Sequence, residues 1–203
     1  MPHLFFVYST MNSGKSLDIL KVAHNYEEQE KKVLLFTSEK DTRNFTADAK
    51  SAKGKIVTRV GLERPAWLIE RVDLYKLVER ELPDCILIDE CQFLSEEIVL
   101  RLVTVVDKFD VPVMCYGLKN DFQNNLFIGS VALLRFADKI RELQTVCYKC
   151  NRKATMNLRL DGGKPMFHGE QIKVGGNESY LPVCRKCYLG LKEEFDERIY
   201  QES

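Results

Sequence analysis

Residues 9–16 read Ser9-Thr10-Met11-Asn12-Ser13-Gly14-Lys15-Ser16, between a short apolar run and an amphipathic stretch. They match the phosphate-loop pattern G-x-x-x-x-G-K-[ST] at every defined position except the first, where Ser9 replaces glycine. Such a loop turns its backbone N–H groups toward phosphate at the positive end of a helix. The lysine of the pattern contacts the β- and γ-phosphates, and its last hydroxyl, here Ser16, binds Mg²⁺. The stretch favours a nucleotide site over a serine-rich turn with an incidental lysine.

Short apolar runs alternate with amphipathic stretches over the first 140 residues or so. Strands are predicted at 4–8, 32–38, 56–60, 85–89 and 111–116, and helices at 14–29, 65–81 and 95–109. Pro65 is expected in the first turn of its helix, and Ser95 is expected as an N-cap. Short apolar strands between helices predict an α/β fold, here a P-loop (RecA-like), mostly parallel sheet flanked by helices.

Two acidic residues, Asp89 and Glu90, end the apolar run at 85–88. At the carboxyl end of a strand beside a phosphate loop, Asp89 is placed to hold Mg²⁺, and Glu90 to accept a proton from an attacking hydroxyl or water. Alone, the stretch would equally fit a solvated acidic turn. The phosphate loop upstream favours the metal-and-base interpretation.

Four of the seven cysteines form two C-x₂-C pairs, Cys147 with Cys150 and Cys184 with Cys187. Four thiolates in two close pairs fit tetrahedral Zn²⁺ with no position left for water, which predicts a structural metal. Two disulfides, a redox pair or an iron–sulfur cluster are the alternatives. The other three cysteines lie singly in apolar stretches and are interpreted as small buried residues.

The composition limits the class of protein. With 30 basic and 30 acidic residues the formal charge is zero, which disfavours a cationic nucleic-acid surface, and 45% hydrophobic residues suffice for a packed core. No apolar run is long enough for a bilayer, and the first residues do not resemble a signal peptide, so a cytoplasmic location is expected.

The predicted organisation is a nucleotide-binding domain at 1–144, a zinc-stapled loop domain at 145–191 and a charged tail at 192–203. The tail is interpreted as a solvated helix or a frayed end. Within the second domain, residues 151–182 are interpreted as a long glycine-rich loop.

Several motifs in this order resemble the zinc-containing thymidine kinase family over nearly the whole chain. They are the phosphate loop, Asp41-Thr42-Arg43, Asp89-Glu90-Cys91-Gln92-Phe93, Gly117-Leu118 followed by Asp121-Phe122, the two cysteine pairs and Val174-Gly175-Gly176 before Tyr180. The serine at position 9 resembles bacterial members. The resemblance implies transfer of the γ-phosphoryl group of ATP to the 5′-hydroxyl of thymidine, in nucleotide salvage for DNA synthesis. It also implies a zinc-bearing lasso over the nucleoside and a homotetramer, with no nucleic-acid or membrane partner.

The resemblance also assigns roles to residues. Glu90 matches the proton acceptor and Asp89 the magnesium-associated acid. The ATP contacts implied are Ser9, Thr10, Met11, Asn12, Ser13, Gly14, Lys15, Ser16, Asp41, Thr42, Arg43, Asp89, Glu90, Cys91 and Gln92. The nucleoside contacts implied are Met11, Phe93, Leu118, Phe122, Phe127, Gln171, Ile172, Lys173, Val174, Gly175 and Tyr180.

Two other functions fit parts of this sequence. One is a P-loop ATPase that reads single-stranded nucleic acid through a zinc ribbon, and its binding would weaken steeply with salt. The other is a nucleotide sensor in which Glu90 performs no chemistry. Product formation from labelled ATP, Mg²⁺ and a panel of nucleosides separates all three.

Overall fold

The structure is a computed structural model that describes residues 1–41, 51–171 and 179–202. The chain divides into two compact units. The sheet unit comprises residues 1–8, 14–118 and 127–142, and the cysteine unit comprises residues 9–13, 119–126 and 143–203. Thr42, Arg43 and residues 172–175, to which the sequence assigns roles, lie outside the described residues.

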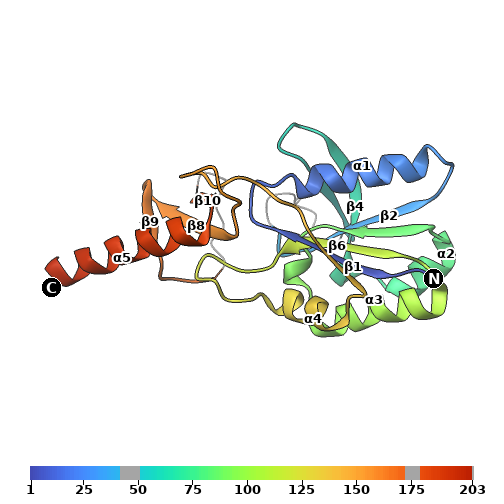
Figure 1. The fold of residues 1–203 in the computed structure, drawn as a ribbon. Helices are drawn as coiled ribbons and strands as arrows, with labels where there is room; N and C mark the ends of the chain where they lie inside the picture. The colour runs from blue at the N-terminus through green and yellow to red at the C-terminus, as the bar shows by residue number, and fades with distance from the viewer. Residues whose placement is uncertain (42–50, 172–178, 203) are drawn as a thin grey trace. The chain divides into compact units, whose positions relative to one another are not determined.

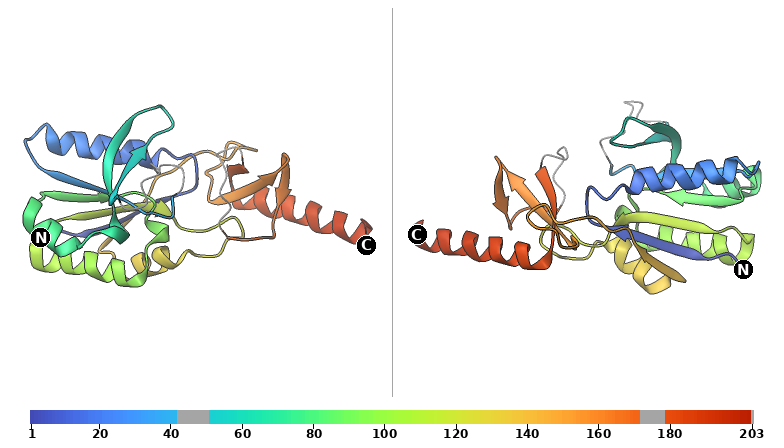
Figure 2. Two further views of the ribbon diagram at one scale, coloured as in Figure 1. Left: turned by 180° about the vertical axis from the view of Figure 1, so that it is seen from behind. Right: turned by 45° about the horizontal axis from the view of Figure 1, so that its top comes forward.

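The sheet unit is built on seven strands in the order β3-β4-β2-β5-β6-β1-β7. Strand β2 pairs in parallel with β4 and β5, β5 with β6 and β1 with β7, whereas β3 and β4 are antiparallel. Figures 1 and 2 show α1 on one face of this sheet and α3 and α4 on the other. The predicted mostly parallel α/β sheet is confirmed.

The elements of the sheet unit follow one another closely. They are β1 (Leu4–Ser9), α1 (Lys15–Glu27), β2 (Val33–Thr37), β3 (Lys53–Val57), β4 (Glu63–Leu68), η2 (Ile69–Arg71), α2 (Leu74–Glu81), β5 (Cys85–Ile88), η3 (Cys91–Phe93), α3 (Glu96–Phe109), β6 (Val113–Leu118), α4 (Ile128–Phe136) and β7 (Lys139–Glu142). All four residues of β5 are buried, as expected for a strand with helices on both faces of its sheet. Helix α3 begins as predicted, because the Ser95 hydroxyl accepts a hydrogen bond from the Ile98 N–H at 3.3 Å.

The predicted helix at 65–81 is wrong in its first half. Pro65 lies in β4 and faces Lys55 of β3, and the helix begins only at Leu74. Asp73 is its N-cap and accepts a hydrogen bond from the Lys76 N–H at 3.3 Å. The apolar spacing that suggested one long helix therefore spans a strand, the 3-10 turn η2 and a short helix. The strand predicted at 56–60 is displaced, since β3 ends at Val57 and a turn follows it.

The cysteine unit contains a three-stranded antiparallel sheet in the order β10-β8-β9, followed by one long helix. Its elements are β8 (Met156–Asp161), β9 (Lys164–Met166), β10 (Tyr180–Val183) and α5 (Arg185–Glu202). Residues 151–182 are thus not a loop without strands, as the sequence suggested, because they contain β8, β9 and all of β10 except Val183. The charged stretch from 192 continues α5 as a helix to Glu202. Among the described residues, no helix combines the length and the hydropathy that a membrane span needs.

Candidate functional site: phosphate loop, acidic pair and cysteine cluster

Two residues of the phosphate loop adopt left-handed backbone conformations. Gly14, the N-cap of α1, has φ 81° and ψ 22°, and Asn12 has φ 64°. A Cβ on Gly14 would meet no atom within 4 Å, so its conformation rather than a lack of space calls for glycine. The backbone N–H groups at the start of α1 have no partner within their own helix, which makes this end suited to an anion.

Ser9, at the position of the missing motif glycine, is buried and hydrogen bonded. Its hydroxyl donates to the Thr10 carbonyl at 2.8 Å and accepts from the Ser13 hydroxyl at 2.5 Å. Ser13 also donates to the Thr10 carbonyl at 3.0 Å. These bonds tie the first five residues of the loop together, so the serine has a structural use here that glycine could not supply.

Asp89 directly follows β5 and is buried against the start of α1. Its carboxylate accepts a hydrogen bond from the Ser16 hydroxyl at 2.8 Å, and its N–H donates to the Phe36 carbonyl at 2.9 Å. Burial, the largest influence, and the neighbouring Glu90 raise the pKa of Asp89 to about 7, although Ser16 and Lys15 act in the opposite direction. The structure thus brings together Lys15, Ser16 and Asp89, as the sequence predicted. A hydroxyl beside a buried carboxylate suits a hard cation such as Mg²⁺.

Glu90 follows in a left-handed conformation that is uncommon for a residue with a side chain, with φ 54° and ψ 37°. Strain of this kind costs roughly 1–3 kcal/mol and is found most often at functional sites. The Glu90 N–H donates to the Asp89 carboxylate at 2.9 Å, and its own buried carboxylate accepts from the Gln92 amide at 2.5 Å. The turn after β5 therefore presents two buried carboxyl groups with separate partners.

The next two residues of the motif point into the protein. The Cys91 side chain is fully buried, and burial raises the pKa of its thiol well above the ordinary range. Gln92 is buried with only 1% of its surface exposed. Sequence reasoning assigned both residues to ATP, but their side chains face the core of the sheet unit.

Of the predicted nucleoside contacts in the sheet unit, Phe93 and Phe127 lie together. Their rings meet edge to face with centroids 5.9 Å apart and an interplanar angle of 84°. Leu118 is half-buried at the end of β6. Two aromatic rings at a right angle form a corner that could receive a flat base.

The predicted contacts in the cysteine unit gather around β8. The Arg159 guanidinium of β8 lies 4.8 Å from the centre of the Phe122 ring, and Tyr180 of β10 pairs with Arg159 in register. The Phe122 carbonyl also accepts a hydrogen bond from the Tyr188 hydroxyl at 2.7 Å. Phe122 and Tyr180 are therefore both buried neighbours of Arg159, a residue that sequence reasoning did not identify.

Asn157 of β8 is, after Arg159, the second residue that the sequence did not reveal as part of this region. Its buried amide accepts a hydrogen bond from the Met11 N–H at 2.8 Å and donates to the Asn120 carbonyl at 3.1 Å. It thus holds part of the phosphate loop and the turn at 119–126 together within the cysteine unit. The alternation of Met156, Leu158 and Leu160 with polar residues is the strand signal that could have revealed β8.

Two further predicted contacts lie beside the parts of the chain that are not described. The Gln171 amide donates to the Asp121 carboxylate at 2.9 Å. Asp41 is buried, and its N–H donates to the Ser38 carbonyl at 3.1 Å.

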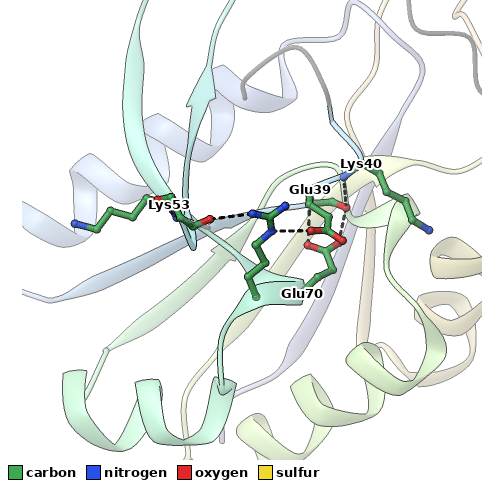
Figure 3. Close-up of polar contacts among 7 residues, drawn as sticks. Glu39, Lys40, Lys53 and Glu70 are labelled. Carbon is green, nitrogen blue, oxygen red and sulfur yellow. Dashed lines mark hydrogen bonds and ion pairs between the residues drawn. The ribbon is translucent and has the colours of Figure 1, made fainter. Parts of the chain in front are cut away.

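A polar cluster fixes the backbone that leads to Asp41. Glu70 accepts hydrogen bonds from the Ser38 hydroxyl at 2.5 Å and from the Glu39 N–H at 3.0 Å. Arg71 donates to the Glu39 carboxylate at 2.8 Å and to the Ser51 carbonyl at 3.2 Å. Figure 3 shows Glu39 and Glu70 side by side in this cluster. Residues on both sides of the 42–50 segment are therefore anchored to η2.

The four paired cysteines converge in the cysteine unit, and their sulfur atoms all lie within 4.8 Å of one another. The Cys150 sulfur is 3.7 Å from the sulfurs of Cys184 and Cys187. A tetrahedral ion with Zn–S bonds of about 2.3 Å requires sulfurs about 3.8 Å apart, so the donor set and its spacing fit a metal such as zinc.

Backbone hydrogen bonds favour the thiolate at two of the cysteines, whereas the neighbouring Cys184 side chain raises the pKa of Cys187 to about 12. Burial raises the pKa of Cys147, but backbone hydrogen bonds from Cys184, Lys149 and Cys150 outweigh it and hold the pKa at about 7. A backbone hydrogen bond from Cys187 lowers the pKa of Cys184. Thiolate is the form that binds a metal.

Comparisons with known proteins agree with the motifs. The family model "Thymidine kinase" matches residues 2–188. A thymidine kinase of Streptococcus agalactiae is 53% identical over 192 residues, which cover 93% of this chain and 98% of that protein. Thymidine kinases of Shouchella clausii and Enterococcus faecalis are 54% and 49% identical, over 93% and 98% of this chain and 96% and 100% of their own. A solved structure of Bacteroides Pif1 bound to single-stranded DNA is 17% identical, and the match covers 70% of this chain and 38% of that one. Its TM-score of 0.38 is too low to indicate a shared fold or function.

Proposed function

The chain belongs to the thymidine kinase family, and we propose that it transfers the γ-phosphoryl group of ATP to the 5′-hydroxyl of thymidine, giving thymidine monophosphate for DNA precursor synthesis. The observation that carries the chemistry is the hydrogen bond from Ser16 to Asp89 at 2.8 Å, with Glu90 as the next residue. It brings the last residue of the phosphate loop to the acid at the end of β5, with a second carboxylate beside them.

The residues of the phosphate loop bind and orient the triphosphate in this proposal. The backbone N–H groups at the start of α1 and the Lys15 ammonium face the transferred group, where negative charge must be neutralised. Ser16 and Asp89 would hold Mg²⁺, which when bound supplies positive charge to the phosphates. The raised pKa of Asp89 marks a carboxylate whose charge is poorly compensated in the protein alone, as expected for a cation ligand.

Glu90 accepts the proton of the 5′-hydroxyl as the oxygen attacks phosphorus. The bond to the γ-phosphoryl group forms in line with the bond to the leaving ADP oxygen, so no covalent enzyme intermediate is needed. The left-handed backbone and the bond from Gln92 fix where this carboxylate points. A base held in one geometry is the kind that contributes to proton transfer.

The remaining contacts are proposed from the family motifs. The family motif assigns Asp41, Thr42 and Arg43 to the phosphates, and Cys91 would contribute through its backbone because its side chain is buried. The nucleoside contacts are Met11, Phe93, Leu118, Phe122, Phe127, Tyr180 and residues 171–175. The edge-to-face pair of Phe93 and Phe127 supports an aromatic wall for the thymine ring.

The four cysteines bind structural zinc in this proposal, and residues 145–191 form the lasso domain that the zinc holds in shape. A filled shell of four thiolates leaves the metal no position for substrate. We further propose a homotetramer, as the family resemblance implies, and a cytoplasmic location, where thiols stay reduced.

The test is product formation by the purified protein. With labelled ATP, Mg²⁺ and a panel of nucleosides, we expect label in thymidine monophosphate and none without thymidine. Glu90→Gln should lower kcat by at least about 100-fold while ATP still binds, because only proton acceptance is lost. Hydrolysis stimulated by single-stranded DNA would point instead to an ATPase, and ATP binding without product to a nucleotide sensor.

A further inference from the structure

The side chain of Gln92 joins the acidic turn to the end of β6. Its amide nitrogen donates to the Glu90 carboxylate at 2.5 Å, and its amide oxygen accepts from the Leu118 N–H at 3.0 Å. Because a backbone N–H can only donate, the oxygen of the amide must face Leu118 and its NH₂ group must face Glu90. The orientation of the amide is therefore determined by the backbone and favours a carboxylate at position 90.

The peptide of Leu118 is held from its other side as well. Its carbonyl accepts a hydrogen bond from the hydroxyl of Ser130 at 2.6 Å, and Ser130 is fully buried in α4. Hydrogen bonds thus run from α4 through Leu118 and Gln92 to Glu90. Groups in such a buried network are restricted to few rotamers, since each lost bond leaves an unpaired polar atom.

Two glycines make room for this arrangement. A Cβ on Gly117 would lie 2.5 Å from the amide oxygen of Gln92 and 2.7 Å from the sulfur of Cys91. A Cβ on Gly129 would lie 2.4 Å from the Cys91 carbonyl oxygen and 2.9 Å from that of Gln92. Real Cβ atoms do not approach other atoms so closely, so the close packing of β6 and α4 against η3 requires glycine at both positions.

We propose that Gln92 is a positioning residue for Glu90 rather than an ATP contact. Both ends of its amide are already engaged inside the sheet unit, and only 1% of its surface is exposed. Its effect on the reaction is to hold the Glu90 carboxylate in the one orientation that meets the 5′-hydroxyl, and it reaches that carboxylate only because position 117 is glycine. This inference rests on the proposed role of Glu90 as proton acceptor.

The first test replaces Gln92 by methionine, which keeps the length of the side chain and removes both hydrogen bonds. We expect kcat to fall by about 10- to 100-fold, the effect of a misplaced catalytic group, with the KM for ATP changed less than about twofold. The exposed Gln29, replaced by methionine, is the matched control and should retain wild-type kinetics. A large rise in the KM for ATP at unchanged kcat would show an ATP contact and overturn the proposal.

The second test asks whether Gln92 acts through Glu90. In a Glu90→Gln background, adding Gln92→Met should change the residual rate little, because residues that act as a unit are not additive. The same factor of loss in both backgrounds would overturn the proposal. If wild-type protein makes no thymidine monophosphate, the proposed function fails instead, which is a distinct result.

A third variant tests the same proposal in case the Gln92→Met protein does not fold. Gly117→Ala keeps the glutamine but places a methyl group against its amide oxygen, so kcat should fall while the KM for ATP is retained. Melting temperature and bound zinc, measured for each variant, report on the fold. A folded Gly117→Ala protein with wild-type kcat would contradict the required close approach.

Discussion

In the sheet unit the acidic pair directly follows a strand whose four residues are all buried. In the cysteine unit Cys187 lies in helix α5, and the other three paired cysteines lie outside the three short strands. The core of the sheet unit draws on strands β1, β2, β5 and β6 and on helices α2, α3 and α4, and includes Leu102 of α3 and Ile88 of β5. The core of the cysteine unit is small and includes two of the metal-site residues, Cys147 and Cys184. Burial of apolar side chains therefore orders the first site, and we expect the second to depend more on a metal bound by the four thiols.

Metal removal should separate the two units most clearly. Structural zinc contributes about 10–16 kcal/mol to folding in small zinc domains, so a chelator or Cys184→Ser should unfold the cysteine unit. We expect amide hydrogen exchange to rise throughout residues 143–202 and to stay low in β5 and α3. Cys85→Ser, at a buried cysteine away from the cluster, is the control and should retain its zinc. Unchanged exchange in the metal-free protein would show that the strands hold this unit without the ion.

A cavity in the core of the sheet unit should destabilise that unit and leave the cysteine unit unaffected. Leu102 is fully buried in the sheet unit, and truncation of such a leucine to alanine costs about 2–5 kcal/mol. The loss should be seen in denaturant unfolding followed by Trp67, the single tryptophan of the chain, which lies in β4. Leu100→Ala, at a partly exposed position of the same helix, should cost much less. Zinc released at a lower denaturant concentration from Leu102→Ala than from Leu100→Ala would mean that the two units do not unfold independently.

The two regions also differ in how much of them the sequence predicts. The phosphate loop, the acidic pair and the cysteine pairs are local patterns, in which a few adjacent residues require one chemistry, and the fold brings each set together as expected. The role of Asn157 depends on Met11, 146 positions away, and no local pattern specifies such a partner. The prediction that Pro65 begins a helix was wrong for a related reason. The place of Pro65 in β4 depends on pairing with β3 and not on its neighbours in sequence.

Loss of the Asn157 amide should have an intermediate effect, confined to the cysteine unit. Asn157→Ala leaves the Met11 N–H and the Asn120 carbonyl without this partner, and an unpaired buried group costs about 1–3 kcal/mol. We expect faster hydrogen exchange in residues 9–13 and 119–126, with β5 unchanged. Asn125→Ala, an exposed residue of the same turn, serves as the control. Equal exchange in both variants would show that the Asn157 bonds do not hold these segments together.

The last effect is a pH dependence whose sign differs between the two units. Burial raises the pKa of Asp89 from near 3.8 in the unfolded chain to about 7, so between these values the folded protein binds a proton that the unfolded chain has released. Stability therefore falls as pH rises through this window, by about 1.4 kcal/mol per pH unit at most, in Mg²⁺-free buffer.

Asp89→Asn should remove that slope, whereas Asp107→Asn, at an exposed position of α3, should retain it. Zinc sites weaken in the opposite direction, as acid protonates thiolates, so unfolding followed by Trp67 at pH 5.5–7.5 distinguishes the two units. The same slope in Asp89→Asn as in wild type would mean that the Asp89 carboxyl keeps its charge when the protein folds.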